Sequence, residues 1–248
     1  MMAERSPHPT AACCERDGRL YYASGIDYPT CNGVIDLTPD LPLTQAAIAS
    51  AVDFFTARQL PFMWWPLCHD CEALERTGFQ PGGTMKGIVL ELAHWEPKVL
   101  DLPAGLAIRE VCAPEEQLLF MRIMAQAFGM NPGAEQQMAA IFQAAVEQGD
   151  MHNLMAYVDD VPVATVTLST CSSVGGLWDG ACLPDYRRRG ILTALLQAAL
   201  QESRRRGQQH AMAILMPKGM ARGPTQTLGM VDVSDHPFYL YGATGPLE

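Results

Sequence analysis

A chain of 248 residues can form one large domain or two smaller ones. Its composition, 48% hydrophobic and 18% charged residues, is that of a globular protein with a buried core. The net charge of −10 argues against general nucleic-acid binding. Gly, Pro or charged residues interrupt the apolar runs before they reach the length of a membrane span, and the opening MMAERSPHPTAACCERDG lacks the apolar core of a signal peptide. We therefore expect a cytoplasmic protein without membrane or nucleic-acid partners.

The first predicted helix covers residues 42–60, PLTQAAIASAVDFFTARQL. Ile48, Val52 and Phe55 are spaced so that they share one helical face, which predicts burial of that face. A strand, TMKGIVLEL, follows at residues 84–92.

Between these two elements lies CHDC, with Cys68, His69 and Cys71. A zinc site normally needs two such ligand pairs, and the sequence contains no second CxxC or HxxxH. Eight cysteines in a chain of this length also do not make a disulfide scaffold. We interpret the cysteines as ordinary, partly buried thiols and expect no bound metal.

A proline-containing linker, His94–Gly105, breaks the periodicity, after which a new series of elements begins. The order predicted is strand, helix, helix, a hairpin of two strands turning at Asp159-Asp160, a third strand, a helix and two more strands. This order implies a mixed sheet with helices packed on its faces. The elements are expected at residues 106–111, 113–129, 133–150, 152–170, 174–183, 190–206, 210–217 and 238–241.

Three arginines precede the glycine that opens the last helix, in LPDYRRRGILTALLQAALQESRRRG, residues 183–207. The first N–H groups of a helix have no intrahelical partners, and the helix dipole adds partial positive charge there. Glycine allows a phosphate to approach the backbone, and arginines add charge and forked donors. The pattern therefore favours a phosphate site over a solvated basic turn, although it matches neither a P-loop nor the GxGxxG fingerprint.

The stretch LPDYRRRGILTALL resembles the acetyl-CoA signature of the GNAT acetyltransferase superfamily: a hydrophobic strand, a proline, an aromatic residue, then Arg/Gln-x-x-Gly-x-Gly/Ala. Pro184, Tyr186, Arg187 and Gly190 fall in register, and the resemblance in element order extends from about Leu106 to Tyr241. It implies acetyl-CoA as co-substrate, with the strand end pairing with pantetheine and the following backbone binding the pyrophosphate. The residues implied are Ala181, Cys182, Leu183, Arg187, Arg188, Arg189, Gly190, Ile191, Leu192 and Thr193.

Two positions depart from the family pattern. Leu192 stands where a second small residue is usual, so its side chain either crowds a phosphate or turns into the core. Thr225 stands where many members carry the tyrosine that protonates the leaving thiolate, so that proton would come from Tyr239, Tyr241 or water.

Asp179, in LWDGAC, is the candidate base that assists deprotonation of the acceptor amine. Burial in a cleft can tune a carboxylate for this task. The alternative is a strand residue that faces solvent or caps a turn. The adjacent Trp178 is interpreted as a packing residue and not as a stacking surface for substrate. Cys182 is interpreted as a core thiol and not as a nucleophile, since the family transfers the acyl group directly.

The first half resembles the N-terminal regions of tandem proteins in which a degenerate GNAT-like half precedes an active one. The segments that carry this resemblance are YPTCNGVI, LPFMWWP and ALERTGFQPGG, whose Gly78-Phe79 parallels Gly229-Met230. No arginine-glycine turn is present there, so this half is expected to bind no CoA and to line the acceptor side. The predicted division is a flexible N-terminus (1–19), a degenerate half (20–93), a linker (94–105) and an acetyltransferase domain (106–248).

The predicted fold class is α/β (α+β), with two GNAT-like halves that each contain a mixed, mostly antiparallel sheet flanked by helices. The favoured function is an acetyl-CoA-dependent N-acyltransferase acting by direct transfer on a primary amine of a small molecule or peptide, in a chain that could form a homodimer. The alternative is a non-catalytic acyl-CoA-binding or interaction protein, which Leu192 and Thr225 would suit.

Overall fold

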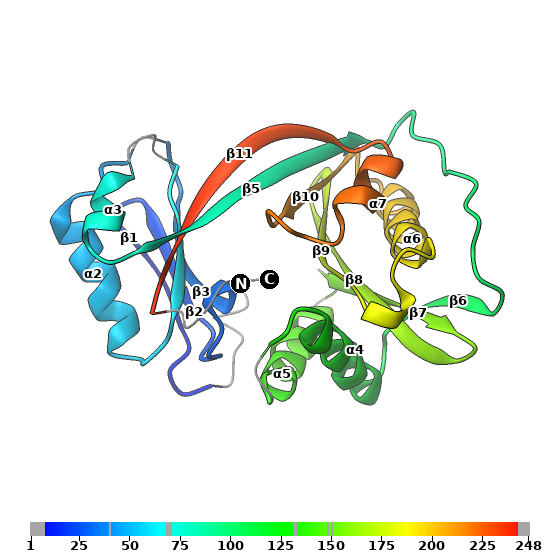
Figure 1. The fold of residues 1–248 in the computed structure, drawn as a ribbon, viewed down its shortest axis with the longest axis horizontal. Helices are drawn as coiled ribbons and strands as arrows, with labels where there is room; N and C mark the ends of the chain where they lie inside the picture. Colours follow the sequence, from blue (N-terminus) through cyan, green and yellow to red (C-terminus); the bar gives the residue numbers. More distant parts are fainter. Residues whose placement is uncertain are drawn as a thin grey trace. The chain divides into compact units, whose positions relative to one another are not determined.

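The computed structural model describes residues 8–39, 41–67, 71–130, 133–147, 149 and 151–242 (Figure 1). They fall into two compact units, the first within Met1–Met85 and Asp235–Leu247 and the second within Lys86–Ser234. The strands β5 (Gln80–Glu91) and β11 (Val231–Tyr241) each run from one unit into the other. The unit boundaries therefore fall inside strands, and the expected linker 94–105 belongs to the second unit.

The first unit contains a mixed sheet in the order β1-β2-β3-β4-β11. Neighbouring strands are antiparallel except β3 and β4, which are parallel and joined through a helix. Its remaining elements are β1 (Ala12–Arg16), β2 (Arg19–Ala23), η1 (Pro29–Cys31), β3 (Asn32–Asp36), α2 (Gln45–Thr56), β4 (Phe62–Trp65) and α3 (Glu72–Arg76).

The helix α2 has the buried face that its sequence predicts. Ile48 and Phe55 are buried and Val52 is half-buried against the same cluster. The Phe55 ring stacks on that of Phe62 of β4, with 4.1 Å between ring centroids. At the start of the helix, the Thr44 side chain accepts a hydrogen bond from the Ala47 N–H and thereby replaces a missing intrahelical partner.

The N-terminal segment is more ordered than the sequence indicates. Residues 12–16, expected within a flexible N-terminus, form β1 and pair with β2 across a turn at Asp17 and Gly18. The next residue, Arg19, is buried and donates to Asp36 at 2.9 Å. This order depends on hairpin pairing and on a buried ion pair with a distant residue, which local composition does not reveal.

The second unit contains a mixed, mostly antiparallel sheet in the order β5-β10-β9-β8-β7-β6. Only β9 and β10 are parallel neighbours. Asp159 and Asp160 both adopt positive φ between β7 and β8, which confirms the predicted hairpin. The strands are β6 (Leu106–Glu110), β7 (Met151–Val158), β8 (Val161–Cys171), β9 (Val174–Cys182) and β10 (His210–Leu215).

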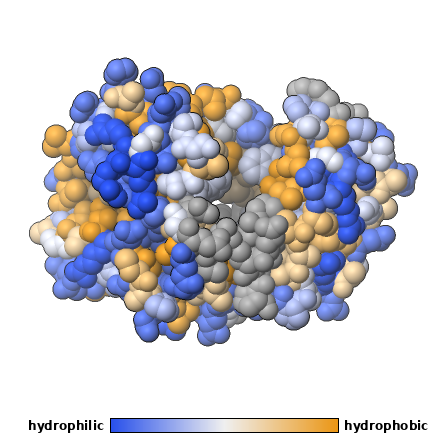
Figure 2. All heavy atoms as spheres, turned by 180° about the vertical axis from the view of Figure 1, so that it is seen from behind, coloured by the Kyte–Doolittle hydropathy of each residue, from blue (hydrophilic) through white to orange (hydrophobic). Residues whose placement is uncertain are grey.

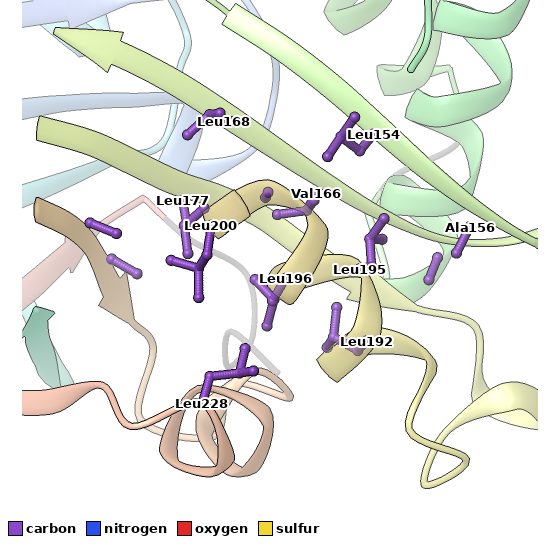
Figure 3. Close-up of a cluster of buried hydrophobic side chains, with 14 of the residues drawn as sticks. Leu154, Ala156, Val166, Leu168, Leu177, Leu192, Leu195, Leu196, Leu200 and Leu228 are labelled. Atoms are coloured by element: carbon purple, nitrogen blue, oxygen red, sulfur yellow. The ribbon is translucent and has the colours of Figure 1, made fainter. Parts of the chain in front are cut away.

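Helices cover both faces of this sheet. An apolar cluster joins α6 to one face, with Leu192, Leu195, Leu196 and Leu200 packed against the strands (Figure 3). Asn153 points to the opposite face, because its neighbour Leu154 belongs to that cluster, and it bonds Gln117 of α4. The helices are α4 (Pro114–Ala127), α5 (Ala134–Glu147), η2 (Pro184–Tyr186), α6 (Ile191–Arg205) and α7 (Arg222–Thr227).

The segment 94–105 runs along α6. The Trp95 carbonyl accepts from Arg204, and the Lys98 N–H and C=O both bond the Gln197 side chain, at 2.7 and 3.1 Å. The segment is thus attached to the helix at two points.

Hydrophilic and hydrophobic residues are interspersed over the face seen in Figure 2. Within the described residues, no helix combines the length and apolar character needed to cross a membrane.

Candidate functional site

The N-terminus of α6 has open backbone donors. Gly190 caps the helix in the left-handed conformation, with φ 75°, and provides no side-chain cap. The first helical hydrogen bond runs from the Ala194 N–H to the Gly190 carbonyl, at 2.9 Å. The N–H groups of Ile191, Leu192 and Thr193 precede it and therefore have no intrahelical acceptor. Together with the helix dipole, such N–H groups are suited to bind an anion.

The three arginines before Gly190 differ from one another in their contacts. Arg187 holds the loop, because its Nε donates to the Cys182 carbonyl at 2.9 Å and its other nitrogen reaches Ala127 O at 3.4 Å. Arg188 is exposed, with φ 60°. Arg189 lies over the Tyr186 ring, 5.4 Å from its centroid. Within the described part of the chain, neither Arg188 nor Arg189 forms an ion pair, so both charges are available to a ligand.

The strand before this loop has an open edge. The parallel pairing of β9 with β10 runs from Val174 to Leu177 and stops there. Beyond it, the Cys182 N–H contacts the Met220 sulfur at 3.2 Å. On the other edge, the Leu183 N–H is already used by Val163 O of β8. The Cys182 carbonyl also accepts from Arg187, so an extended ligand can pair with residues 178–181, on the β10 side only.

The predicted cofactor-binding side chains near this edge are mostly buried. Ala181 and Cys182 on β9, and Ile191, Leu192 and Thr193 on α6, are each at most 9% exposed. Leu192 belongs to the apolar cluster, so its side chain turns into the core and leaves its backbone N–H free (Figure 3). These residues would therefore contact a cofactor mainly through their backbone.

Asp179 lies at an irregularity in β9. Its φ is 54°, and the pairing register between β8 and β9 shifts opposite it, between Thr165 and Thr167. Although the residue as a whole is partly exposed, its Oδ2 is buried and has no hydrogen-bond partner within the described structure. Burial raises the pKa of Asp179 from its usual 3.8 to about 6, against a smaller lowering by Thr167. The group can therefore exchange a proton near neutral pH.

A chain of buried polar side chains leads away from Asp179, and the sequence analysis missed it. The Thr167 hydroxyl, beside the carboxyl, donates to Asn153 Oδ1 at 2.7 Å, and Asn153 donates to Gln117 Oε1 at 2.8 Å. A hydroxyl has one proton, so Thr167 can serve either Asn153 or the carboxylate. The signal available in the sequence was the alternation of Thr165, Thr167 and Ser169 along an otherwise apolar strand.

Tyr239 and Tyr241 belong to the first unit, on the part of β11 that pairs with β4. The Tyr239 hydroxyl reaches Glu75 at 3.5 Å, and burial raises its pKa to about 12. The Tyr241 ring packs 4.9 Å from that of Phe79. The structure therefore brings Asp179 and the CoA-type residues into the second unit and the two tyrosines into the first.

Two other side chains considered from the sequence are engaged within the second unit. The Thr225 hydroxyl has two acceptors for its one proton at the start of α7, Ala221 O at 2.9 Å and Arg222 O at 3.0 Å. Burial raises the pKa of the Cys182 thiol, which favours the thiol over a nucleophilic thiolate.

The candidate site residues show no metal cluster, and none of them lines the cavity found in the first unit. Among the described residues, no group of three or more His, Cys, Asp or Glu side chains is placed to hold a metal, whereas Cys68 and His69 lie outside the described part. A cavity of about 560 Å³ lies in the first unit, lined by Arg16, Ala46, Ala49, Ser50, Asp53, Phe54 and Arg58.

Comparison with known proteins identifies the same part of the chain. Residues 119–220, which include β9 and the start of α6, match the model of the Acetyltransferase (GNAT) family. None of the proteins with curated functions matches the sequence.

Solved structures extend the likeness to the first unit. A GCN5-related N-acetyltransferase from Kribbella flavida superposes with a TM-score of 0.69 at 17% identity, covering 98% of this chain and 92% of that one. One from Sphaerobacter thermophilus gives 0.68 at 15%, covering 90% and 76%. A tandem GNAT protein from the clavulanic acid biosynthesis pathway gives 0.60 at 12%, covering 98% and 92%. At such identities the likeness establishes the fold. Residues 119–220 thus match the acetyltransferase (GNAT) family, within a chain whose fold is shared with a tandem GNAT protein.

Proposed function

We propose that the second unit is an acetyl-CoA-dependent N-acetyltransferase that transfers the acetyl group directly to a primary amine of a small molecule or peptide. The observation that carries this proposal is the combination of an open helix N-terminus at Gly190 with an unpaired strand edge leading to it. An anion site and an extended backbone edge suit the two ends of a CoA arm, and the family match supports acyl transfer.

The proposed donor site uses groups that the fold leaves available. The N–H groups of Ile191, Leu192 and Thr193 would receive the pyrophosphate, and Arg188 and Arg189 would add charge. The edge of residues 178–181 would pair with pantetheine, which directs the thioester toward Asp179. Arg187 would position the loop, since its guanidinium already bonds the loop backbone.

Asp179 would act as the base. Near neutral pH a carboxyl with a pKa of about 6 is largely ionised and can take a proton from the incoming ammonium. The neutral nitrogen then attacks the thioester carbonyl, forming a C–N bond as the C–S bond breaks. A thiol pKa of about 8.5 makes the thiolate a good leaving group, so we assign its protonation to water. This assignment fits the location of the two tyrosines in the first unit, where Tyr239 is buried and Tyr241 is half-buried against the same apolar cluster.

The test is thiol release from acetyl-CoA with a panel of amines, together with calorimetric CoA binding to Gly190→Asp. We expect binding to be lost, because the change adds bulk and negative charge at the anion site. A Cβ at Gly190 would meet Asp101 O and Leu102 Cδ2 at 3.2 Å, so Gly190→Ala is needed to separate crowding from charge. Gly207→Asp is the matched control: Gly207 also has positive φ, but it lies beyond the other end of α6 with open space around it.

Unchanged CoA affinity in folded Gly190→Asp would refute the donor site. CoA binding without thiol release from any amine would favour the alternative, a non-catalytic acyl-CoA-binding protein. A cytoplasmic location and a homodimer remain predictions, which fractionation and light scattering would test.

A further inference from the structure

The indole of Trp178 is exposed but held in one orientation. The residue is 36% exposed, and its Nε1 donates to Ser169 Oγ on β8 at 2.7 Å. The ring lies over Gly176: a Cβ there would be 2.5 Å from Nε1 and 3.0 Å from Cε2. Glycine at 176 and serine at 169 thus fix a large apolar ring at the surface, where it adds little to the core.

The irregularity in β9 brings Trp178 and Asp179 to the same face. In a regular strand, consecutive side chains point to opposite faces. Here Trp178 bonds Ser169 while Asp179 lies beside Thr167, and these two partners are separated by two positions on β8 and so share a face. The shift in register and the positive φ of Asp179 account for the change, as at other β-bulges.

This shared face is the one opposite the α6 cluster. Thr167 bonds Asn153, which in turn bonds Gln117 of α4. The pair also lies at the start of the open β9 edge, which begins after Leu177. A thioester bound along that edge would therefore end beside both an indole face and a carboxyl group.

We propose that Trp178 and Asp179 form the acceptor subsite, and that it selects a primary amine with an aromatic skeleton and no carboxylate on the amine-bearing carbon. The aromatic ring of the substrate would pack on the Trp178 indole, and the nitrogen of its amino group would lie beside the Asp179 carboxyl. A carboxylate beside the nitrogen would face Asp179, whose Oδ2 is already buried without a partner. This inference rests on the proposed function, since it names the substrate class of the same site.

The test compares 2-phenylethylamine with ethylamine, which lacks the ring, and with phenylalanine, which adds the carboxylate. Thiol release gives kcat/KM for each amine, and calorimetry gives binding that does not require turnover. In the wild-type protein we expect a preference of about tenfold or more for 2-phenylethylamine over each of the others. Trp178→Ala should reduce the preference over ethylamine to near unity with unchanged CoA affinity, whereas Trp178→Phe should keep most of it.

Ser169→Ala is a second, milder variant. It removes only the hydrogen bond that orients the indole, so we expect an intermediate preference with an unchanged melting temperature. If Trp178 had a purely structural role, its substitution would alter stability but leave the ratio of kcat/KM between the amines unchanged.

The outcomes separate this inference from the proposed function. Thiol release with a preference that does not depend on Trp178, or equal use of phenylalanine, overturns the inference while the acetyltransferase stands. Binding of 2-phenylethylamine that is lost in Trp178→Ala, without thiol release, supports the subsite and refutes the enzyme. Absence of both binding and release with 2-phenylethylamine overturns the subsite.

Discussion

At the scale of single residues, burial of Asp179 lowers the stability of the fold, while the same burial suits the residue for its proposed role as a base. Burial raises its pKa to about 6, so at neutral pH the fold holds a carboxylate with one oxygen that has no described partner. An unpartnered buried charge opposes folding. We therefore expect replacement of Asp179 to increase the stability of the protein and to reduce its activity.

Asp179→Asn should raise stability above about pH 6. Because the folded pKa lies above the usual 3.8, ionisation of Asp179 does not weaken the fold below pH 3.8, weakens it progressively between 3.8 and 6, and has its full effect above 6. Asparagine does not titrate, so the variant should gain on the order of 1–2 kcal/mol at pH 8, after allowance for the partly exposed residue. Thermal melts of the variant and the wild-type protein at pH 4 and pH 8 measure this gain. An equal gain in stability at both pH values would contradict the prediction. Turnover should fall in the same variant.

Thr167→Val should move the acidic limb of the rate profile to higher pH. The threonine lowers the pKa of Asp179, so its removal leaves burial unopposed and raises that pKa further. Only the ionised carboxylate accepts a proton, which means that activity should appear later as pH rises. The pH dependence of kcat/KM measures the shift. Thr170→Val, on the same strand but half-buried near its end, is the control, and an equal shift there would remove the specific role of Thr167.

At the scale of elements, α6 combines a core face with an exposed N-terminus. Leu192 shows how the two are separated: its side chain packs in the apolar cluster, while its N–H belongs to the open first turn (Figure 3). The departure from the family pattern at this position thus affects packing more than the anion site.

Leu192→Ala should destabilise the protein without tightening CoA binding. Truncation of a buried leucine typically costs about 2–5 kcal/mol. The expected result is a clearly lower melting temperature, with CoA affinity in the folded protein within about twofold of wild type. Gln201→Ala, on the exposed side of the same helix, should change stability by less than about 0.5 kcal/mol. Markedly tighter CoA binding in Leu192→Ala would show that the leucine crowds the phosphates after all.

Local elements could be predicted from the sequence because their signals are local. The Asp159-Asp160 hairpin and the glycine that opens α6 follow from residues adjacent in the chain. The surroundings of Asp179 could not be predicted, since they depend on a one-residue irregularity and on Asn153 and Gln117 from other elements. The ordered β1 was missed for a similar reason, because its partner strand and the Arg19–Asp36 ion pair act through the fold.

At the scale of the whole molecule, each compact unit contains a strand segment from the other half of the sequence. In the second unit, β10 pairs with residues 86–91 of β5, which come from the first half of the sequence. In the first unit, β4 pairs with residues 239–241 of β11, which come from the second half of the sequence. A division at the proline-rich segment 94–105 therefore separates sequence halves but not compact units, and sequence patterns could not show it because such pairing is non-local.

A shortened protein that begins at Leu102 should therefore aggregate, because β10 loses its partner along residues 210–215 and the end of β11 loses β4. Cleavage of the complete chain should have a different result. Val99 is fully exposed and follows Lys98, which is attached to Gln197, so a protease site inserted there should be cut without loss of any strand. We expect the two pieces to remain together in gel filtration and to bind one CoA per pair, because each piece still contributes a strand to the other's sheet. Separation of the pieces, with CoA bound by the 100–248 piece alone, would show that the second half is complete without β5.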